Sequence, residues 1–319
     1  MKAVFQHALA VDEHAGVYTP RRFSLAQFDY LRGLGEVVFH SASSCAGITM
    51  AFRTDAETVR FSYDSSMYRR SFLYFDVYEN GMFCEQIRID GKPSRGGFCY
   101  ERREAGDSLI EIHLPYSCRV GISDFQAGNW RPQDSGPIDY LALGDSITLG
   151  SDSGGASLNF PSLLSRALGL NALNQGIGTY YHDPAFADRL PDLSPRLITL
   201  GYGAGDLHHF DYATSVSHIE AVHSLIRGRF PHTAVAVITP VWRAVDEENT
   251  DSAAQFQSLR SVIAQSAQKH GFFVIDGLRL TPHIPRYYHD ATLHPDERGF
   301  MFYTLDCLRQ LNARLPFDL

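Results

Sequence analysis

The stretch IDYLALGDSITLG, residues 138–150, decides how the second half of this chain folds. Residues 138–143 form a short apolar run, and Gly-Asp-Ser and a polar, glycine-containing segment follow. A run of this length that ends in a glycine turn predicts a buried strand. Ser146 then follows the strand, either as an exposed nucleophile or as a residue that, with Asp145, only caps the next segment. The local sequence leaves both interpretations open.

Downstream of this stretch, strand and helix patterns alternate. Further strands are predicted at 197–200, 234–239 and 272–275. Three helices are predicted from residues that share one apolar face at helical spacing. The first two lie between strands and have the faces Val216, Ile219, Val222, Ile226 and Phe256, Leu259, Ile263, Ala267. The last begins at about Glu297 and has the face Phe300, Thr304, Cys307, Leu308, Leu311. This alternation predicts an α/β domain with a parallel sheet covered on both faces and a ligand site at the carboxyl ends of the strands.

Upstream, residues 1–130 have the pattern of an antiparallel β-structure. Six segments rich in Val, Ile, Phe and Tyr are predicted strands, namely EVVFHSA, GITMAFRT, TVRFSYDS, FLYFDVYENGMFCEQIRID, SLIEIHLPY and CRVGISDF. In the fourth segment Leu73, Phe75 and Val77 alternate with the intervening residues, and Asn80-Gly81 predicts a tight hairpin turn. We therefore expect a β-sandwich of jelly-roll type over 1–130. The polar segment QAGNWRPQDSGP is typical of a linker, and we place the α/β domain that follows it over 131–319.

Composition limits the class of protein and of partner. The chain has 319 residues, 44% hydrophobic and 20% charged, as is usual for a globular protein. Its net charge of −8 argues against nucleic-acid binding, and no segment approaches the ~18 apolar residues of a membrane span. The N-terminus does not resemble a secretory signal. The five cysteines are scattered and form no CxxC pair, which argues against a disulfide framework or a metal site and favours a cytoplasmic setting.

A second motif, HDATLHPDERGF, lies near the C-terminal end of the chain. His294 comes just before the last predicted helix, with Pro295 as a helix-start signal, and Asp290 precedes it by four residues. An imidazole on this sheet edge can act as general base toward a serine hydroxyl, and a nearby carboxylate would fix its tautomer. A structural role is the common alternative for any one of the chain's 14 histidines.

Together, LGDSITLG and the D…HP element resemble the SGNH (GDSL-type) hydrolases, over roughly residue 138 to the C-terminus. The resemblance implies a three-layer α/β/α domain and ester hydrolysis through an acyl-serine. Carried over to this sequence, Ser146 is the nucleophile, His294 the base and Asp290 the residue that orients His294. The backbone N–H of Ser146 would contribute to the oxyanion hole. The resemblance implies no metal and no organic cofactor.

Between these motifs the sequence departs from the family pattern. Where the family has N-x-G-x-G-G, this chain has NQGIGT, so Gly178 or Thr179 is the candidate oxyanion donor. Where the family has G-x-N-D, Gly205 replaces the Asn whose side chain donates to the oxyanion. His208, His209 or a water is a candidate replacement. If a donor site is vacant there, we expect Gly205→Asn to hold or raise activity. The family spacing D-x-x-H is also one residue shorter than the spacing here.

Four further residues are candidate substrate contacts. Trp242 and Arg243 follow a predicted strand at the same sheet edge, and Tyr180 follows the second motif. Asp145 adjoins the serine itself. For the two aromatic residues and the arginine, a packing role is the alternative interpretation.

The family's combination of a β-sandwich with an SGNH domain resembles bacterial carbohydrate esterases. We therefore expect a serine esterase that removes acetyl or another small acyl group from a small-molecule or oligosaccharide ester. One alternative is a non-catalytic binding protein for acylated glycans, which the glycine at 205 favours. Another is a lipid acylhydrolase or thioesterase, although no apolar lid segment stands out. The sequence leaves a homo-oligomer open.

Overall fold

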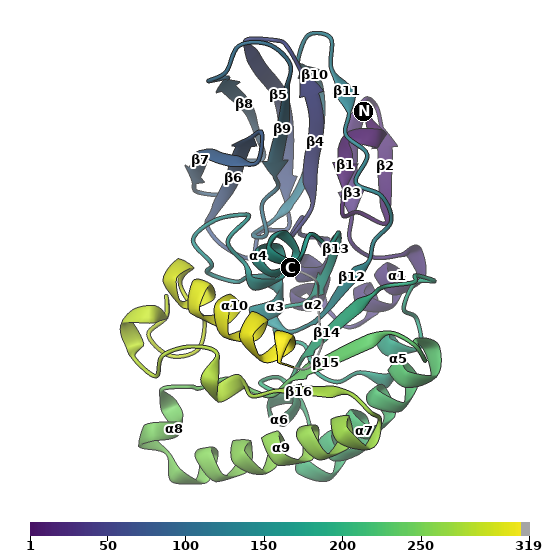
Figure 1. The fold of residues 1–319 in the computed structure, drawn as a ribbon, viewed down its shortest axis with the longest axis vertical. Helices are drawn as coiled ribbons and strands as arrows, with labels where there is room; N and C mark the ends of the chain where they lie inside the picture. The colour runs from purple at the N-terminus through teal and green to yellow at the C-terminus, as the bar shows by residue number, and fades with distance from the viewer. Residues whose placement is uncertain (314–319) are drawn as a thin grey trace. The chain divides into compact units, whose positions relative to one another are not determined.

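The computed structural model describes residues 1–313, which fall into two compact units (Figure 1). The first unit comprises Met1–Pro137 and Gly155–Ser157, and the second comprises Ile138–Gly154 and the chain from Leu158 onward. The division between Pro137 and Ile138 lies beyond the boundary expected at 130, because the short strand β11 (Arg131–Pro132) pairs with a strand of the first unit. Part of the polar segment 126–137, which was expected to be a linker, therefore belongs to the first unit.

The first unit contains two antiparallel sheets, with strand orders β1-β4-β9-β6-β7, to which β11 adds at β4, and β2-β3-β10-β5-β8. One core contains aromatic side chains from both sheets, including Phe52, Phe61, Phe75 and Phe98, so the unit is the expected sandwich. Its elements are η1 (Lys2–Val4), β1 (Phe5–Gln6), β2 (Ala10–His14), β3 (Val17–Arg21), α1 (Leu25–Gly33), α2 (Glu36–Ser43), β4 (Thr49–Thr54), β5 (Thr58–Ser66), β6 (Phe72–Glu79), β7 (Met82–Asp90), β8 (Arg95–Glu101), β9 (Ser108–His113), β10 (Arg119–Gln126) and β11.

The predicted hairpin between β6 and β7 is confirmed. Glu79 pairs with Met82, and Asn80 and Gly81 have φ of 50° and 78°, as a two-residue turn of this kind requires. Alternate residues of β6 enter the sandwich core as predicted. The intervening residues are buried too, among them Asp76, which is 0% exposed. This strand is therefore covered on both faces.

The segment EVVFHSA was expected to be a strand but forms helix α2. Helix α1 before it begins with a capping box at Ser24, and Gly35 with φ 110° separates the two helices. The Arg22 guanidinium donates to the carbonyl oxygens of Ser41 (2.8 Å) and Ser44 (2.9 Å) at the end of α2. These bonds satisfy carbonyls that a helix end leaves unpaired. The prediction was wrong because tertiary contacts outweighed the β-propensity of the Val and Phe residues.

The second unit is built on a five-stranded parallel sheet with order β13-β12-β14-β15-β16. Its elements are β12 (Tyr140–Gly144), α3 (Ser146–Leu149), α4 (Phe160–Leu168), β13 (Ala172–Gly176), α5 (Pro184–Ala187), β14 (Leu197–Gly201), α6 (Asp206–His209), α7 (Tyr212–Arg229), β15 (Ala234–Ile238), α8 (Val245–Glu248), α9 (Thr250–Lys269), β16 (Phe273–Ile275), η2 (Gly277–Arg279), η3 (Pro285–Tyr287) and α10 (Glu297–Asn312).

Helices pack on the sheet in two groups. Helices α4 and α10 contact each other and share a core with Tyr140, Ala142 and Ala236 of the sheet (Figure 1). Helices α7 and α9 pack together, and α9 contacts β15 and β16. The alternating strands and helices, the predicted strands and the last helix are confirmed. Strand β13 and helix α4 were not predicted, because their short apolar runs are interrupted by Asn and Gln in β13 and by Pro and Ser in α4.

Candidate active site

Three neighbouring strands of the parallel sheet end at the same level. Gly144 of β12 pairs with Gly176 of β13 on one side and with Gly201 of β14 on the other. Because the strands are parallel, the loops that leave their carboxyl ends begin at one edge of the sheet. These loops carry Ser146, the 177–180 segment and the 202–205 segment, so the structure gathers these parts of the candidate site at one edge.

Ser146 is the first residue of the short helix α3 and is half-buried. The helix packs closely on the strand end, since a Cβ at Gly144 would lie 2.0 Å from Thr148 Oγ1. Asp145 caps the helix, and its Oδ1 accepts the N–H of Ile147 at 2.9 Å. Both interpretations from the local sequence therefore describe part of the structure. Asp145 forms the cap, and Ser146 is left at the helix start with its hydroxyl available.

A continuous chain of hydrogen bonds runs from this serine to a carboxylate. Ser146 Oγ lies 2.8 Å from Nε2 of His294, and Nδ1 of His294 lies 2.7 Å from Oδ2 of Asp290. The His294 side chain is 19% exposed and that of Asp290 is 34% exposed. With Nδ1 donating to the carboxylate, Nε2 can accept the serine proton. The geometry is that of a nucleophile, its base and an orienting acid.

The extra residue between Asp290 and His294 fits into a tight loop. Ala291 takes a left-handed conformation with φ 59°, and an isolated bridge pairs Tyr288 with Pro295. Oδ1 of Asp290 accepts the backbone N–H groups of Thr292 (2.9 Å), Leu293 (2.8 Å) and His294 (3.1 Å). The loop thus holds the carboxylate toward the ring despite the longer spacing.

The environment of each carboxyl group shifts its pKa. Burial acts to raise the pKa of Asp290, but the His294 ring and the N–H groups of Leu293 and Thr292 together hold it well below its usual range. Asp290 is therefore ionised at neutral pH. Burial raises the pKa of Asp145 to about 6, against the lowering effect of the Ile147 N–H and the charge of His294.

Asp152 is a site residue that the sequence analysis missed. Its Oδ2 lies 4.0 Å from Nδ1 of His294, and its side chain is 5% exposed. It has a left-handed backbone with φ 65° in the loop after α3. A non-glycine residue in this conformation is uncommon and often marks a functional loop, but no motif in the sequence distinguishes this Asp. A second carboxylate therefore faces the same imidazole nitrogen.

The segment predicted to supply oxyanion donors packs against Gly205. A Cβ at position 205 would lie 2.2 Å from the carbonyl oxygen of Tyr180 and 3.1 Å from that of Thr179. Main chain already fills the space for a side chain at this position, so the condition of a vacant donor site is not met and we expect Gly205→Asn to lower activity. Thr179, where the family has glycine, adopts a left-handed φ of 65°. Gly178 precedes it, and its carbonyl accepts the Thr179 hydroxyl at 2.6 Å.

The remaining substrate-contact candidates make packing contacts. Tyr180 is 0% exposed, and its hydroxyl donates to Asp183 at 2.7 Å. Trp242 is 4% exposed, and its indole N–H donates to Glu247 at 3.0 Å. The Arg243 guanidinium lies over the Phe256 ring, 3.3 Å from its centroid. These contacts match the packing alternative. The Asp145 side chain, 6% exposed, forms the cap described above.

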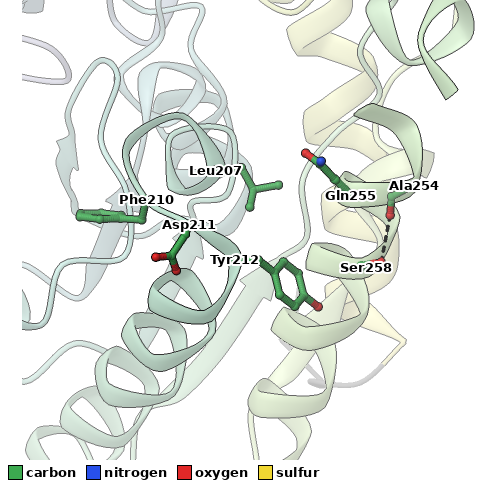
Figure 2. A pocket seen from close by; sticks show the side chains of 7 residues that line it. All are labelled: Leu207, Phe210, Asp211, Tyr212, Ala254, Gln255 and Ser258. Atoms are coloured by element: carbon green, nitrogen blue, oxygen red, sulfur yellow. Dashed lines mark hydrogen bonds between the residues drawn. The ribbon is translucent and has the colours of Figure 1, made fainter. Parts of the chain in front are cut away.

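A separate cavity of about 530 Å³ lies beside helices α6, α7 and α9 (Figure 2). Its lining residues are Leu207, Phe210, Asp211, Tyr212, Ala254, Gln255 and Ser258. Figure 2 shows Leu207 and Gln255 pointing toward each other and Tyr212 pointing toward α9. None of the predicted site residues lines this cavity, which is therefore distinct from the chain of hydrogen bonds at Ser146.

Residues 1–313 contain neither a candidate metal site nor a candidate membrane-spanning helix. No group of three or more His, Cys, Asp or Glu side chains is placed to hold a metal ion. None of the helices described there combines the length and apolar character needed to cross a membrane.

At the carboxyl edge of the parallel sheet, a serine, an imidazole and a carboxylate are joined by hydrogen bonds, an arrangement that suits nucleophilic catalysis of acyl transfer. The sequence profile of the GDSL-like lipase/acylhydrolase family matches residues 142–301, half of the chain. The chain belongs to this family and is a carboxylic ester hydrolase.

Solved structures resemble the chain over most of its length. A salicylyl-acyltransferase, SsfX3, from a tetracycline biosynthetic pathway has a TM-score of 0.81 at 21% identity, covering 98% of this chain and 95% of that one. A family two carbohydrate esterase from Clostridium thermocellum, in complex with cellohexaose, has a TM-score of 0.67 at 11% identity, covering 86% and 94%. One from Cellvibrio japonicus has a TM-score of 0.65 at 13% identity, covering 97% and 98%. No protein with a curated description matches the chain.

Proposed function

We propose that this protein is a serine esterase that removes acetyl or another small acyl group from a carbohydrate. The observation that carries the proposal is the unbroken chain of hydrogen bonds Ser146–His294–Asp290, at 2.8 and 2.7 Å. The fold likeness to two family two carbohydrate esterases supports the substrate class. The family match supports ester hydrolysis.

In the first half of the reaction, Ser146 Oγ attacks the acyl carbonyl while His294 Nε2 takes its proton. Asp290 accepts the Nδ1–H and stabilises the imidazolium that forms. The tetrahedral oxyanion receives hydrogen bonds from the backbone N–H of Ser146 and from N–H groups of the 178–179 segment. The intermediate then collapses, His294 gives its proton to the leaving sugar oxygen, and the acyl-serine remains.

In the second half, His294 takes a proton from a water molecule that attacks the acyl-serine. The new tetrahedral intermediate releases the carboxylic acid, and the proton returns to Ser146 Oγ. Each half-reaction uses the same base and the same oxyanion donors. No electron acceptor or metal enters the scheme.

Ser146→Ala tests the nucleophile. We expect turnover of p-nitrophenyl acetate by the wild-type protein and a fall of kcat to the background rate in the variant. Equal rates in the two proteins would rule out Ser146-dependent hydrolysis. Release of acetate from acetylated oligosaccharides, compared with hydrolysis of a p-nitrophenyl ester of a long fatty acid, tests the substrate class. A higher kcat/KM for the long-chain ester would instead favour a lipid acylhydrolase.

Acyl transfer to an alcohol is a second candidate, which the likeness to the salicylyl-acyltransferase SsfX3 along almost the whole chain favours. The same acyl-serine forms, and an alcohol replaces water in the second half of the reaction. Adding increasing concentrations of a sugar alcohol and measuring ester product against free acid separates the two candidates. A product that is free acid at every alcohol concentration supports the esterase.

The alternative of a non-catalytic glycan-binding protein depended on a missing donor at position 205. Steric exclusion by the Tyr180 carbonyl gives a different reason for glycine there. The close approach of the Tyr180 carbonyl is by itself a sufficient reason for glycine at this position.

A further inference from the structure

The loops after β13 and β14 are joined by a buried histidine–aspartate pair. His182 and Asp206 are 1% and 0% exposed. Oδ1 of Asp206 accepts the backbone N–H of His182 at 3.1 Å, and Nδ1 of the ring lies 3.0 Å from both carboxylate oxygens. Because a buried carboxylate without donors is strongly unfavourable, these bonds hold the two loops in one arrangement.

The other end of helix α6 makes a second contact to the same loop. His209, the last residue of α6, donates from Nε2 to the carbonyl oxygen of Thr179 at 3.0 Å. The next backbone N–H, of Tyr180, donates to the carbonyl of Ile177 at 3.2 Å. The peptide group between Thr179 and Tyr180 is thus hydrogen-bonded at both its oxygen and its nitrogen, and its orientation is fixed.

These two contacts belong to a helix of only four residues, Asp206–His209. A single helical turn is not stable by itself, so its position depends on what its side chains bond. Its first and last residues both bond the segment 179–182. Gly205 directly precedes the helix, and its lack of a side chain allows the Tyr180 carbonyl to pack closely against it, since a Cβ there would lie 2.2 Å from that oxygen.

We propose that Asp206 and His209 are positioning residues for an oxyanion hole made only of main-chain N–H groups. In this inference, which rests on the proposed function, helix α6 holds the 177–182 loop in the conformation from which the 178–179 segment donates to the oxyanion. This fixed loop takes the place of the side-chain donor that the sequence lacks at 205. Preorganised donors of this kind supply a large part of the stabilisation of the transition state in acyl transfer.

The exposed His209 offers a test that leaves the core intact. We expect His209→Ala to lower kcat roughly 10- to 100-fold with little change in KM, since the donors act mainly on the transition state. We expect His209→Gln to recover most of that loss, because its amide Nε2 can donate to the same carbonyl. His232→Ala, an exposed histidine on another loop, is the matched control. Wild-type kcat in His209→Ala, or a fall confined to His208→Ala, would overturn the proposal.

Hydrogen exchange tests the loop without relying on activity. In a Ser146→Ala background, His209→Ala and Asp206→Asn should speed amide exchange in residues 177–182 by several-fold or more, with the strands of the sheet unchanged. Unchanged exchange in that loop would overturn the proposal, whatever the activity. If the wild-type protein hydrolyses no ester while exchange responds as expected, the proposed function fails and the positioning of the loop by α6 stands.

Discussion

Two carboxylates, Asp290 and Asp152, face the same nitrogen of His294, at 2.7 and 4.0 Å. Only the first is within hydrogen-bond distance. Asp290 is also fixed by three backbone N–H groups, which orient it independently of the ring. The geometry therefore favours Asp290 over Asp152 for the orienting role in the proposed mechanism.

We expect Asp290→Asn to lower kcat by ~10²- to 10⁴-fold, because an amide neither fixes the Nδ1–H tautomer of the neutral imidazole nor stabilises the imidazolium that forms. Asp152→Asn should lower it less than about 10-fold, since its carboxyl oxygen lies 4.0 Å from Nδ1 of His294, beyond hydrogen-bond distance. Measuring kcat of the two variants by steady-state kinetics at the same pH compares the roles of the two carboxyl groups. The reverse order of the two effects would assign the orienting role to Asp152.

Asp145 gives a stability prediction with a defined sign. Burial raises its pKa from 3.8 to about 6, so between these values the folded state keeps a proton that the unfolded state has released. Stability of the wild-type protein is therefore lost as pH rises through this window. Asn can form the same helix cap without this loss. Relative to wild type, Asp145→Asn should gain stability from pH 4 to pH 7, by at most ~3 kcal/mol.

The measurement is the free energy of unfolding in urea at pH 4.5 and 7.5. Asp211→Asn is the matched control, since Asp211 also caps a helix, but its exposed carboxyl has a lowered pKa because it accepts hydrogen bonds from Thr214. The control should show nearly the same difference from wild type at both pH values, because a carboxyl whose pKa is lowered below 3.8 is already ionised in both states at pH 4.5. A pH-independent difference between Asp145→Asn and wild type would contradict the raised pKa.

At the scale of elements, the approach of the 177–182 loop to helix α6 makes Gly205 sensitive to substitution. Gly205 has an ordinary φ of −76°, so only space, not backbone strain, forbids a side chain there. We expect Gly205→Ala to lower both Tm and kcat, because the Tyr180 carbonyl must move. Gly228→Ala in α7, where a Cβ meets nothing within 4 Å, should be stabilising by ~1 kcal/mol. Equal Tm changes in the two variants would show that the loop yields easily.

The elements also show where sequence patterns were sufficient. The strands around 140, 198 and 236 and the final helix were predicted because each has a clear local period. The segment 36–42 was not, because its β-branched residues favour a strand while Arg22 and the neighbouring capping box stabilise a helix. Strand β13 was not predicted because Asn and Gln occupy buried positions within it.

At the scale of the whole molecule, the first unit is built from two separate stretches of the chain, residues 1–137 and 155–157. Segment 155–157 belongs to that unit, where the carboxylate of Asp76 accepts the N–H (2.8 Å) and the hydroxyl (2.7 Å) of Ser157. Gln86 donates to its other oxygen at 3.1 Å. The side chain is 0% exposed, and all of these partners are donors, which suits a carboxylate.

We expect Asp76→Asn to lower the free energy of unfolding by ~1–3 kcal/mol, because the new amide N–H₂ would face groups that also donate. A thermal melt measures the effect, and faster cleavage by a protease within the loop around 155–157 should accompany it. Asp90→Asn is the control on the same sheet, since that side chain is 75% exposed. Equal melting temperatures for the two variants would show that the Ser157 contacts contribute little.

The sequence by itself determined the alternation of strands and helices, the antiparallel first half, and the Ser146 and His294 pair, because these depend on local period and on short motifs. Only the tertiary structure decided that Asp290 bonds the ring across a longer spacing, that Asp152 lies nearby, and that main chain fills the space beside Gly205. The first fact depends on the left-handed turn at Ala291, and the other two depend on distances between residues far apart in the chain, which close packing sets and no local pattern encodes.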